Sequence, residues 1–270
     1  MTTPQSFHLK KPKDHSSIPI VISAPHVGLD FPDELKDYFP HEIINQPDDT
    51  DWYVDRLYEF APQLGITVIS AKYSRYVIDL NRSPEGKSLY NDGRTETSLV
   101  PVKDFSGTSL YSHSNNEPDN DEIQRRLNLY YQPYHQELAS ILGEKKERFG
   151  KVLLYEAHSI RRHVPLIRTR PFPDLILGDN QGSSCDRLIS QCFKDSLETS
   201  PYHLSYNDPF QGGFLTRNWG KPDQNFHSIQ MEISQDLYLD ESNYLWQDPK
   251  ANKLSETLQK AFENLIKRWC

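Results

Sequence analysis

The chain has 270 residues, with 30 Lys or Arg against 38 Asp or Glu, so its formal net charge is −8. No block of basic residues stands out, which argues against nucleic-acid binding. No run of about 18 apolar residues occurs, so we expect no membrane-spanning helix. The amino-terminal residues lack the apolar segment of a signal peptide, and the three cysteines do not indicate a disulfide scaffold. We therefore expect a cytoplasmic protein.

Apolar, β-branched runs alternate along the chain with segments of helical periodicity. The patterns predict strands at 18–24, 65–71, 76–80, 152–155, 175–177 and 229–233, and helices at 49–63, 121–149, 183–197 and 252–269. A bend is expected near Pro133, because proline interrupts helical hydrogen bonding. Strands that alternate with helices indicate a layered α/β fold. We expect one domain over residues 1–270.

Residues 82–120 form an irregular stretch that is rich in glycine and proline. A loop of this length inside a compact domain is usually functional or disordered. Its aromatic and apolar residues, such as Phe105 and Tyr111, favour an ordered segment, so we interpret it as a cover for an active site. A second loop, with glycines, is predicted at 212–220.

Two histidines follow apolar runs of strand type. His26 comes after IPIVISAP and His158 after KVLLYEA. Open α/β sheets bind ligands at the carboxyl ends of their strands, so both imidazoles are candidates for a common site. A single histidine in such a position is more often structural, but two at matching positions favour a metal site.

A catalytic zinc ion commonly has three protein ligands and one open position. No HExxH or CxxC motif is present, so a third ligand must come from elsewhere. The acidic segment at 48–55 offers Asp51 as the first candidate, with Asp49 second and Asp55 also open. The alternative is that these carboxylates only cap a helix.

Glu232 lies between Met231 and Ile233 in a predicted strand. Alternation places Gln230 and Glu232 on one face and the apolar residues on the other. A carboxylate in an inner strand is costly unless it is paired or used, so Glu232 is a candidate catalytic base. The alternative is an edge strand on which Glu232 faces solvent.

Arginines that suit an acidic ligand occur in two segments, since guanidinium groups bind carboxylates in a bidentate manner. SRYVIDLNR contains Arg75, Asn81 and Arg82, with Asp79 available to orient an arginine. GGFLTRNWG contributes Arg217.

In chain order, six segments resemble the N-formylglutamate amidohydrolase (N-formylglutamate deformylase) family. They are SAPHVGLDFP, DTDWYVDRLY, SRYVIDLNR, YEAHS, GGFLTRNWG and QMEISQDLYLDE. The family is similar to the zinc carboxypeptidases (phosphorylase/hydrolase-like), so the resemblance implies three layers with a mixed, mostly parallel sheet flanked by helices. Carboxypeptidases keep a metal-binding carboxylate three residues after the first histidine, where this chain has Leu29.

The resemblance implies hydrolysis of N-formyl-L-glutamate, a small acidic molecule, to formate and L-glutamate in histidine degradation. The site that it implies has one zinc ion, a catalytic base, an arginine that stabilises the oxyanion, and groups that bind the substrate. The resemblance implies His26, Asp51 and His158 as the zinc ligands and Glu232 as the catalytic base. It implies Arg75 as the arginine that stabilises the oxyanion, and Asn81, Arg82 and Arg217 as the groups that bind the substrate.

Two other functions remain open from the sequence. The chain could be a zinc amidase or carboxypeptidase for another N-acyl amino acid or peptide. It could also be a non-catalytic homologue that binds metal or ligand, although such a protein needs no base at Glu232. No GxSxG or GxxxxGK[ST] motif is present, which disfavours a serine hydrolase and a P-loop nucleotide enzyme. The oligomeric state is left unknown.

Overall fold

The computed structural model describes residues 5–13, 16–86 and 97–270. Its main feature is a seven-stranded sheet with the order β1-β3-β2-β4-β7-β5-β6. The strands are β1 (Phe7–Lys10), β2 (Ile20–Ala24), β3 (Thr67–Ala71), β4 (Val152–Ile160), β5 (Leu175–Gly178), β6 (Leu204–Tyr206) and β7 (Phe226–Ser234). A separate hairpin pairs β8 (Leu239–Asp240) with β9 (Leu245–Trp246).

The four central strands β3, β2, β4 and β7 run parallel to one another. β1 joins one side antiparallel to β3, while β5 pairs antiparallel with β7 and parallel with β6. The prediction of a mixed, mostly parallel sheet is therefore confirmed. Because β2, β4 and β7 are parallel, their carboxyl ends meet at one edge, where α/β proteins bind ligands.

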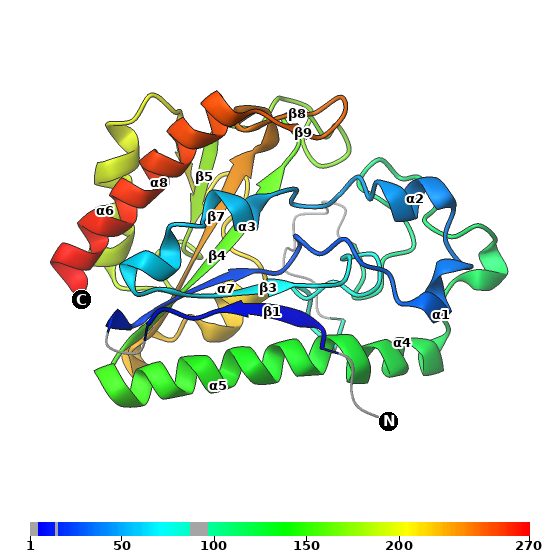
Figure 1. Ribbon diagram of the computed structural model, residues 1–270, viewed down its shortest axis with the longest axis horizontal. Coiled ribbons are helices and arrows are strands. Elements are labelled where there is room, and N and C mark those ends of the chain that lie inside the picture. Colours follow the sequence, from blue (N-terminus) through cyan, green and yellow to red (C-terminus); the bar gives the residue numbers. More distant parts are fainter. Residues whose placement is uncertain (1–4, 14–15, 87–96) are drawn as a thin grey trace.

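Helices cover both faces of the sheet, which gives three layers (Figure 1). On one face lie α3 (Val54–Leu57), α6 (Arg187–Glu198) and α8 (Asp248–Trp269). On the other lie α5 (Gln132–Phe149) and α7 (Phe214–Trp219). The hydrophobic core therefore has two parts, one on each face of the sheet, because successive side chains of a strand point to opposite faces.

Short elements complete the chain. They are α1 (Asp33–Lys36), α2 (His41–Asn45), α4 (Asn120–Arg126), a π-helical segment (Leu127–Tyr131), and 3₁₀ turns at Ala61–Leu64, Ser114–Asn116, Pro222–Gln224 and Gln235–Leu237. The predicted helix at 121–149 is thus α4, the π segment and α5 in succession. Among the residues that the structure describes, no helix combines the length and hydrophobicity that crossing a membrane requires.

The predicted strand at 76–80 is wrong. These residues form turns, in which Val77 N donates to Ser74 O at 2.9 Å and Asp79 N donates to Leu99 O at 2.7 Å. The apolar side chains of this segment fill the core on the α5 side of the sheet. The run is therefore hydrophobic because it is buried, and it does not pair with a neighbouring strand.

The predicted helix at 49–63 is also wrong in extent. Only α3 and a 3₁₀ turn at Ala61–Leu64 are helical. The preceding residues turn away because Asp51 N donates to His26 O at 3.0 Å, and Tyr53 has a φ of 59° in the left-handed region. This local geometry replaces a helical start with a turn that directs Asp51 towards the sheet.

Several elements were not expected from the sequence. They include the edge strands β1 and β6, the short helices α1 and α2, the hairpin strands β8 and β9, and α7 within the predicted loop at 212–220. Part of the predicted loop at 82–120, residues 87–96, lies outside the described residues. The other parts of that loop are irregular apart from the 3₁₀ turn, and then α4 begins.

Candidate metal centre and active site

His26, Asp51 and His158 lie together at the carboxyl ends of β2 and β4. One ligand atom from each residue lies within 4.8 Å of the other two, and all three residues are buried. Asp51 Oδ2 is 3.0 Å from His158 Nδ1 and 3.7 Å from His26 Nδ1. Tetrahedral zinc ligands about 2.1 Å from the ion lie about 3.4 Å apart. The two measured separations lie on either side of that value, so the arrangement fits a metal ion.

Backbone geometry explains how these residues meet. His26 lies two residues after the end of β2, and its carbonyl accepts a hydrogen bond from the backbone N–H of Asp51. The sequence suggested that His158 follows a strand. In the structure β4 continues to Ile160, so His158 lies inside the strand. Because β2 pairs with β4 in parallel, the loop after β2 comes to lie near the end of β4.

Each of the two imidazoles has a carboxylate near its Nε2 atom. His26 Nε2 is 2.7 Å from Asp79 Oδ1, and His158 Nε2 is 3.3 Å from Glu156 Oε2. When Nε2–H donates to the carboxylate, the Nδ1 lone pair faces the space shared with Asp51. Histidine ligands of metals generally donate their other ring N–H in this way, so the second contacts also fit a metal ion.

Charge in this region is predominantly negative. Burial, and next the charge of Arg75, lower the pKa of His26 to about 4, so this imidazole is neutral near pH 7. Burial opposes a charge on His158, but hydrogen bonds to Asp51 and Glu156 outweigh it and raise the pKa of His158 to about 10. The carboxylates that retain this proton would equally favour a divalent cation.

Glu232 lies beside His158 on the neighbouring strand, because the β4–β7 register pairs the two residues. β7 is an inner strand between β4 and β5, and Glu232 is only 9% exposed. The alternative of a solvent-facing edge position is thereby excluded. Burial is the main cause that raises the pKa of Glu232 to about 8, helped by the charge of Asp51. A raised pKa suits a group that must accept and return a proton near neutral pH.

Arg75 is buried beneath the irregular loop. Its Nη2 donates to Asp79 Oδ2 at 2.6 Å, and the ring of Phe105 lies 4.7 Å from its guanidinium carbon. Burial works against a charged Asp79, but Arg75 and His26 outweigh it and hold the pKa of Asp79 well below its usual range. The predicted role of Asp79 in orienting an arginine matches this contact, and Asp79 additionally contacts His26.

Asp49, the second candidate ligand, has another partner. Its Oδ2 accepts the backbone N–H of Phe105 at 2.8 Å, so it holds the loop over Arg75. Burial raises the pKa of Asp49 to about 7. Asp55 lies on α3 and is not in the group formed by Asp51 and the histidines.

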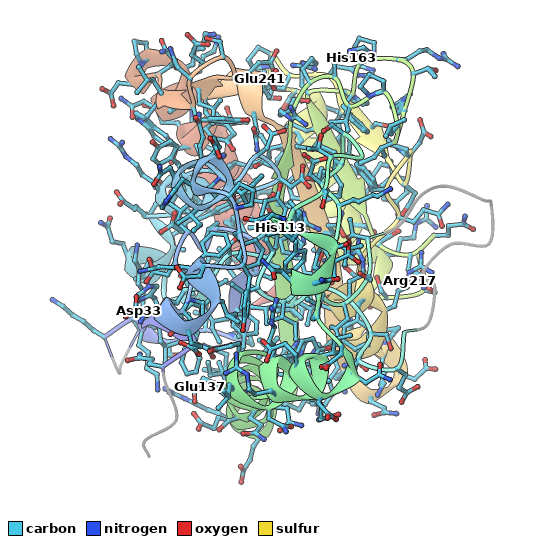
Figure 2. All side chains as sticks on the ribbon, turned by 90° about the vertical axis from the view of Figure 1, so that its right-hand side faces the viewer. Asp33, His113, Glu137, His163, Arg217 and Glu241 are labelled. Carbon is cyan, nitrogen blue, oxygen red and sulfur yellow. The ribbon has the colours of Figure 1, made fainter. Side chains whose placement is uncertain are left out.

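The predicted substrate-binding residues differ in their surroundings. Arg82 donates to Thr97 O at 2.9 Å and to Thr97 Oγ1 at 3.0 Å. Arg217 lies on α7, with its Nε 3.0 Å from Gly212 O, and Figure 2 shows it near the right-hand edge of the view. Asn81 Nδ2 is 3.1 Å from His158 Nε2, so this amide lies beside the candidate metal ligands.

Sequence reasoning missed Glu156 and Thr216 as parts of this site. Thr216 Oγ1 donates a hydrogen bond to Glu156 Oε1, and both residues are fully buried. One signal was available for Glu156: it lies two residues before His158 in an apolar run, so the two side chains share a face of the strand. Nothing in the sequence pattern marks Thr216.

The fold and the candidate metal site together define an α/β protein with a buried His/Asp/His centre at the end of a mostly parallel sheet. The sequence model of one family, described as N-formylglutamate amidohydrolase, matches residues 18–239. The chain belongs to this family.

Two relatives and two solved structures show the extent of the similarity. The chain is 36% identical to the N-formylglutamate deformylase of Pseudomonas putida over 263 residues, which is 97% of this chain and 95% of the relative. It is 36% identical to the enzyme of that name from Pseudomonas aeruginosa, over 92% of this chain and 93% of the relative.

The solved structure of N-formylglutamate amidohydrolase from Ralstonia eutropha JMP134 superposes with a TM-score of 0.81 at 26% identity, covering 97% of this chain and 99% of that one. A gene product of Agrobacterium tumefaciens shares the fold, with a TM-score of 0.71 at 19% identity over 98% and 97% of the two chains.

Proposed function

We propose that this protein hydrolyses N-formyl-L-glutamate to formate and L-glutamate, with one zinc ion bound by His26, Asp51 and His158. The convergence of these three residues, with Glu232 in register beside His158, is the observation that carries the proposal. Membership of the family, and two deformylases that share 36% identity over nearly the whole chain, support the substrate.

A zinc ion in this site supplies Lewis acidity, which polarises a carbonyl group and makes water more acidic. Glu232 accepts a proton from the attacking water and returns it to the departing amine, which becomes the amino group of glutamate. Burial raises the pKa of Glu232, so its carboxylate is a stronger proton acceptor in the first transfer. The departing amine is a stronger base still, and it takes the proton from Glu232 in the second transfer.

Arg75 provides a buried positive charge near the oxyanion that forms when the formyl carbon is attacked. Its hydrogen bond to Asp79 keeps the guanidinium fixed before the reaction, so no reorganisation is needed. The two carboxylates of the substrate require cationic partners, and Arg82 and Arg217 are the candidates, with Asn81 beside them. These assignments, the choice of zinc and the cytoplasmic location are proposals.

The decisive test measures metal content and turnover on the same sample. We expect about one zinc ion per chain, release of formate from N-formylglutamate, loss of that release after treatment with a chelator, and recovery on addition of zinc. Parallel assays with N-acetylglutamate and short peptides separate this activity from that of a different amidase or of a carboxypeptidase. A zinc-loaded protein that releases no formate would instead favour a non-catalytic homologue.

A further inference from the structure

Glu156 is a fully buried carboxylate that no lysine or arginine neutralises within the described part of the chain. A buried charge of this kind is costly unless hydrogen bonds and a positive partner compensate it. Its Oε2 accepts from Asn81 Nδ2 at 2.9 Å and lies 3.3 Å from His158 Nε2, and its Oε1 accepts from Thr216 Oγ1. Three donors therefore converge on one carboxylate directly behind a candidate metal ligand.

The amide of Asn81 is fixed at both ends. Its Oδ1 accepts the backbone N–H of Leu215 at 2.8 Å, while Nδ2 points to Glu156. This pairing sets the orientation of the amide, because only the oxygen can accept from a backbone N–H. Asn81, which was expected to bind the substrate, thus links the first turn of α7 to the carboxylate of Glu156.

The glycine pair before α7 permits this close approach. A Cβ on Gly213 would overlap the side-chain amide of Asn81, and one on Gly212 would come within 2.6 Å of the Thr216 methyl carbon. Gly212 also has a φ of 127°, a conformation that side chains disfavour. The glycines therefore allow α7 to pack against Asn81.

α7 is also linked to the candidate base. Gly213 N donates to Gln230 Oε1 at 2.7 Å, and Gln230 Nε2 lies 3.4 Å from Glu232 Oε2. Thr216 of α7 thus contacts Glu156, which is the partner of His158. The backbone N–H of Gly213, just before the first residue of α7, contacts Gln230, which is the partner of Glu232.

From this network we infer that Thr216 and Glu156 are positioning residues for the metal centre: Thr216 fixes Glu156, and Glu156 fixes the His158 ring with Nδ1 directed to the ion. The inference rests on the proposed function. It assigns α7 a role within the molecule that is separate from the contribution of Arg217 to substrate binding. Outer partners of metal-bound histidines commonly change metal affinity by about 10–100-fold when they are removed.

Thr216→Val tests the inference, because it keeps the shape of the side chain and removes the hydroxyl that serves Glu156. Thr216→Ser restores the hydroxyl. Thr67→Val is the matched control, since Thr67 is a buried threonine at the amino end of β3, away from the site. The zinc Kd of each metal-free protein is measured with zinc alone, by competition with a chromogenic chelator, and the melting temperature of each metal-free protein is measured beside it.

We expect Thr216→Val to weaken zinc binding about 10–100-fold, and we expect Thr216→Ser and Thr67→Val to bind zinc like the unaltered chain. Equal zinc affinity of Thr216→Val and the unaltered chain would overturn the positioning role. A serine variant as weak as the valine variant would also overturn it, because the hydroxyl would then not be the cause.

If Thr216→Val does not fold, Glu156→Gln replaces it, since the amide keeps the shape and removes the charge that orients His158. Unchanged zinc affinity in that variant would count against the inference. An unaltered chain that binds no zinc at all would overturn the proposed metal centre instead, so the two failures are distinguishable.

Discussion

Asp51 and His158 are 107 residues apart in sequence, yet Asp51 Oδ2 lies 3.0 Å from His158 Nδ1. The contact exists because the amide of Asp51 is bonded to the carbonyl of His26, while the parallel β2–β4 pairing brings that loop to the end of β4. Asp49, two residues earlier, points to the loop at Phe105 instead. The two neighbouring carboxylates therefore have separate tasks, and substitution can distinguish them.

Asp51→Asn should remove most bound zinc, because an amide oxygen is a weaker ligand than a carboxylate and the negative charge is lost. Asp49→Asn should keep about one zinc ion per chain, since its side chain bonds the loop. Metal analysis of both purified variants after dialysis checks this. The ligand assignment fails if Asp49→Asn loses the ion and Asp51→Asn retains it.

Glu232→Gln should keep zinc and lower kcat by about 10²–10⁴-fold, the usual contribution of a general acid–base group. KM should change little, since the amide keeps the shape of the side chain. Steady-state formate release, measured with metal content, gives both quantities. Glu256→Gln on the exposed side of α8 serves as the control. Near-normal kcat in Glu232→Gln would remove this residue from the role of base.

Arg217→Ala should raise KM for N-formylglutamate by about 10–100-fold, because a hydrogen bond to a charged group contributes about 1.5–3 kcal/mol. Arg82→Ala should act in the same direction, with an added loss of order at Thr97, to which it donates. The comparison substrate is N-formylglycine, which lacks the side-chain carboxylate. An arginine that binds that carboxylate should affect N-formylglutamate far more than N-formylglycine, and an equal effect on both substrates would place it elsewhere.

Gly213→Ala should destabilise the protein by about 1–3 kcal/mol, the usual cost of overpacking, and should lower kcat because Asn81 must move. Gly143→Ala is the counterpart within α5, where an added Cβ meets no atom within 4 Å. It should stabilise the helix by about 0.5–1 kcal/mol and leave activity unchanged. Urea unfolding and formate release measure both effects. Equal stability of the two variants would contradict the close packing of α7 on Asn81.

The position of His135 leads us to expect that the folded protein loses stability in acid. Burial lowers its pKa to about 4, against an ordinary value of 6.5, so the unfolded chain binds more protons between these values. Stability therefore falls as pH drops from about 6.5 towards 4. Because the ring is half-buried, we expect the free energy of unfolding to fall by about 1–2 kcal/mol between pH 7 and pH 5.

His135→Gln should remove this part of the pH dependence, since glutamine does not titrate and its amide can still donate to Leu80 O. The measurement is urea unfolding of the metal-free protein at both pH values. His113→Gln, at an exposed position labelled in Figure 2, should leave the pH dependence unchanged. An unaltered pH dependence in His135→Gln would show that the ring does not carry the effect.

Local pattern alone determined the parts of this protein that depend on neighbouring residues. The apolar runs predicted the central strands β2, β3, β4 and β7, and the alternation in β7 placed Glu232 opposite Ile229, Met231 and Ile233, as the core confirms. Helical periodicity predicted α6 and α8. These features are readable because side-chain direction repeats with the period of the element.

Only the tertiary structure decided what depends on distant residues. The apolar segment at 76–80 was mistaken for a strand because burial, and not sheet pairing, explains its hydrophobicity. The sequence ranked Asp51 before Asp49 as a candidate ligand, but only the tertiary structure shows the backbone hydrogen bond to His26 and the position of Asp51 beside both histidines. The roles inferred for Glu156 and Thr216 arise from a contact across 60 residues, and no local pattern encodes the partner of a buried carboxylate.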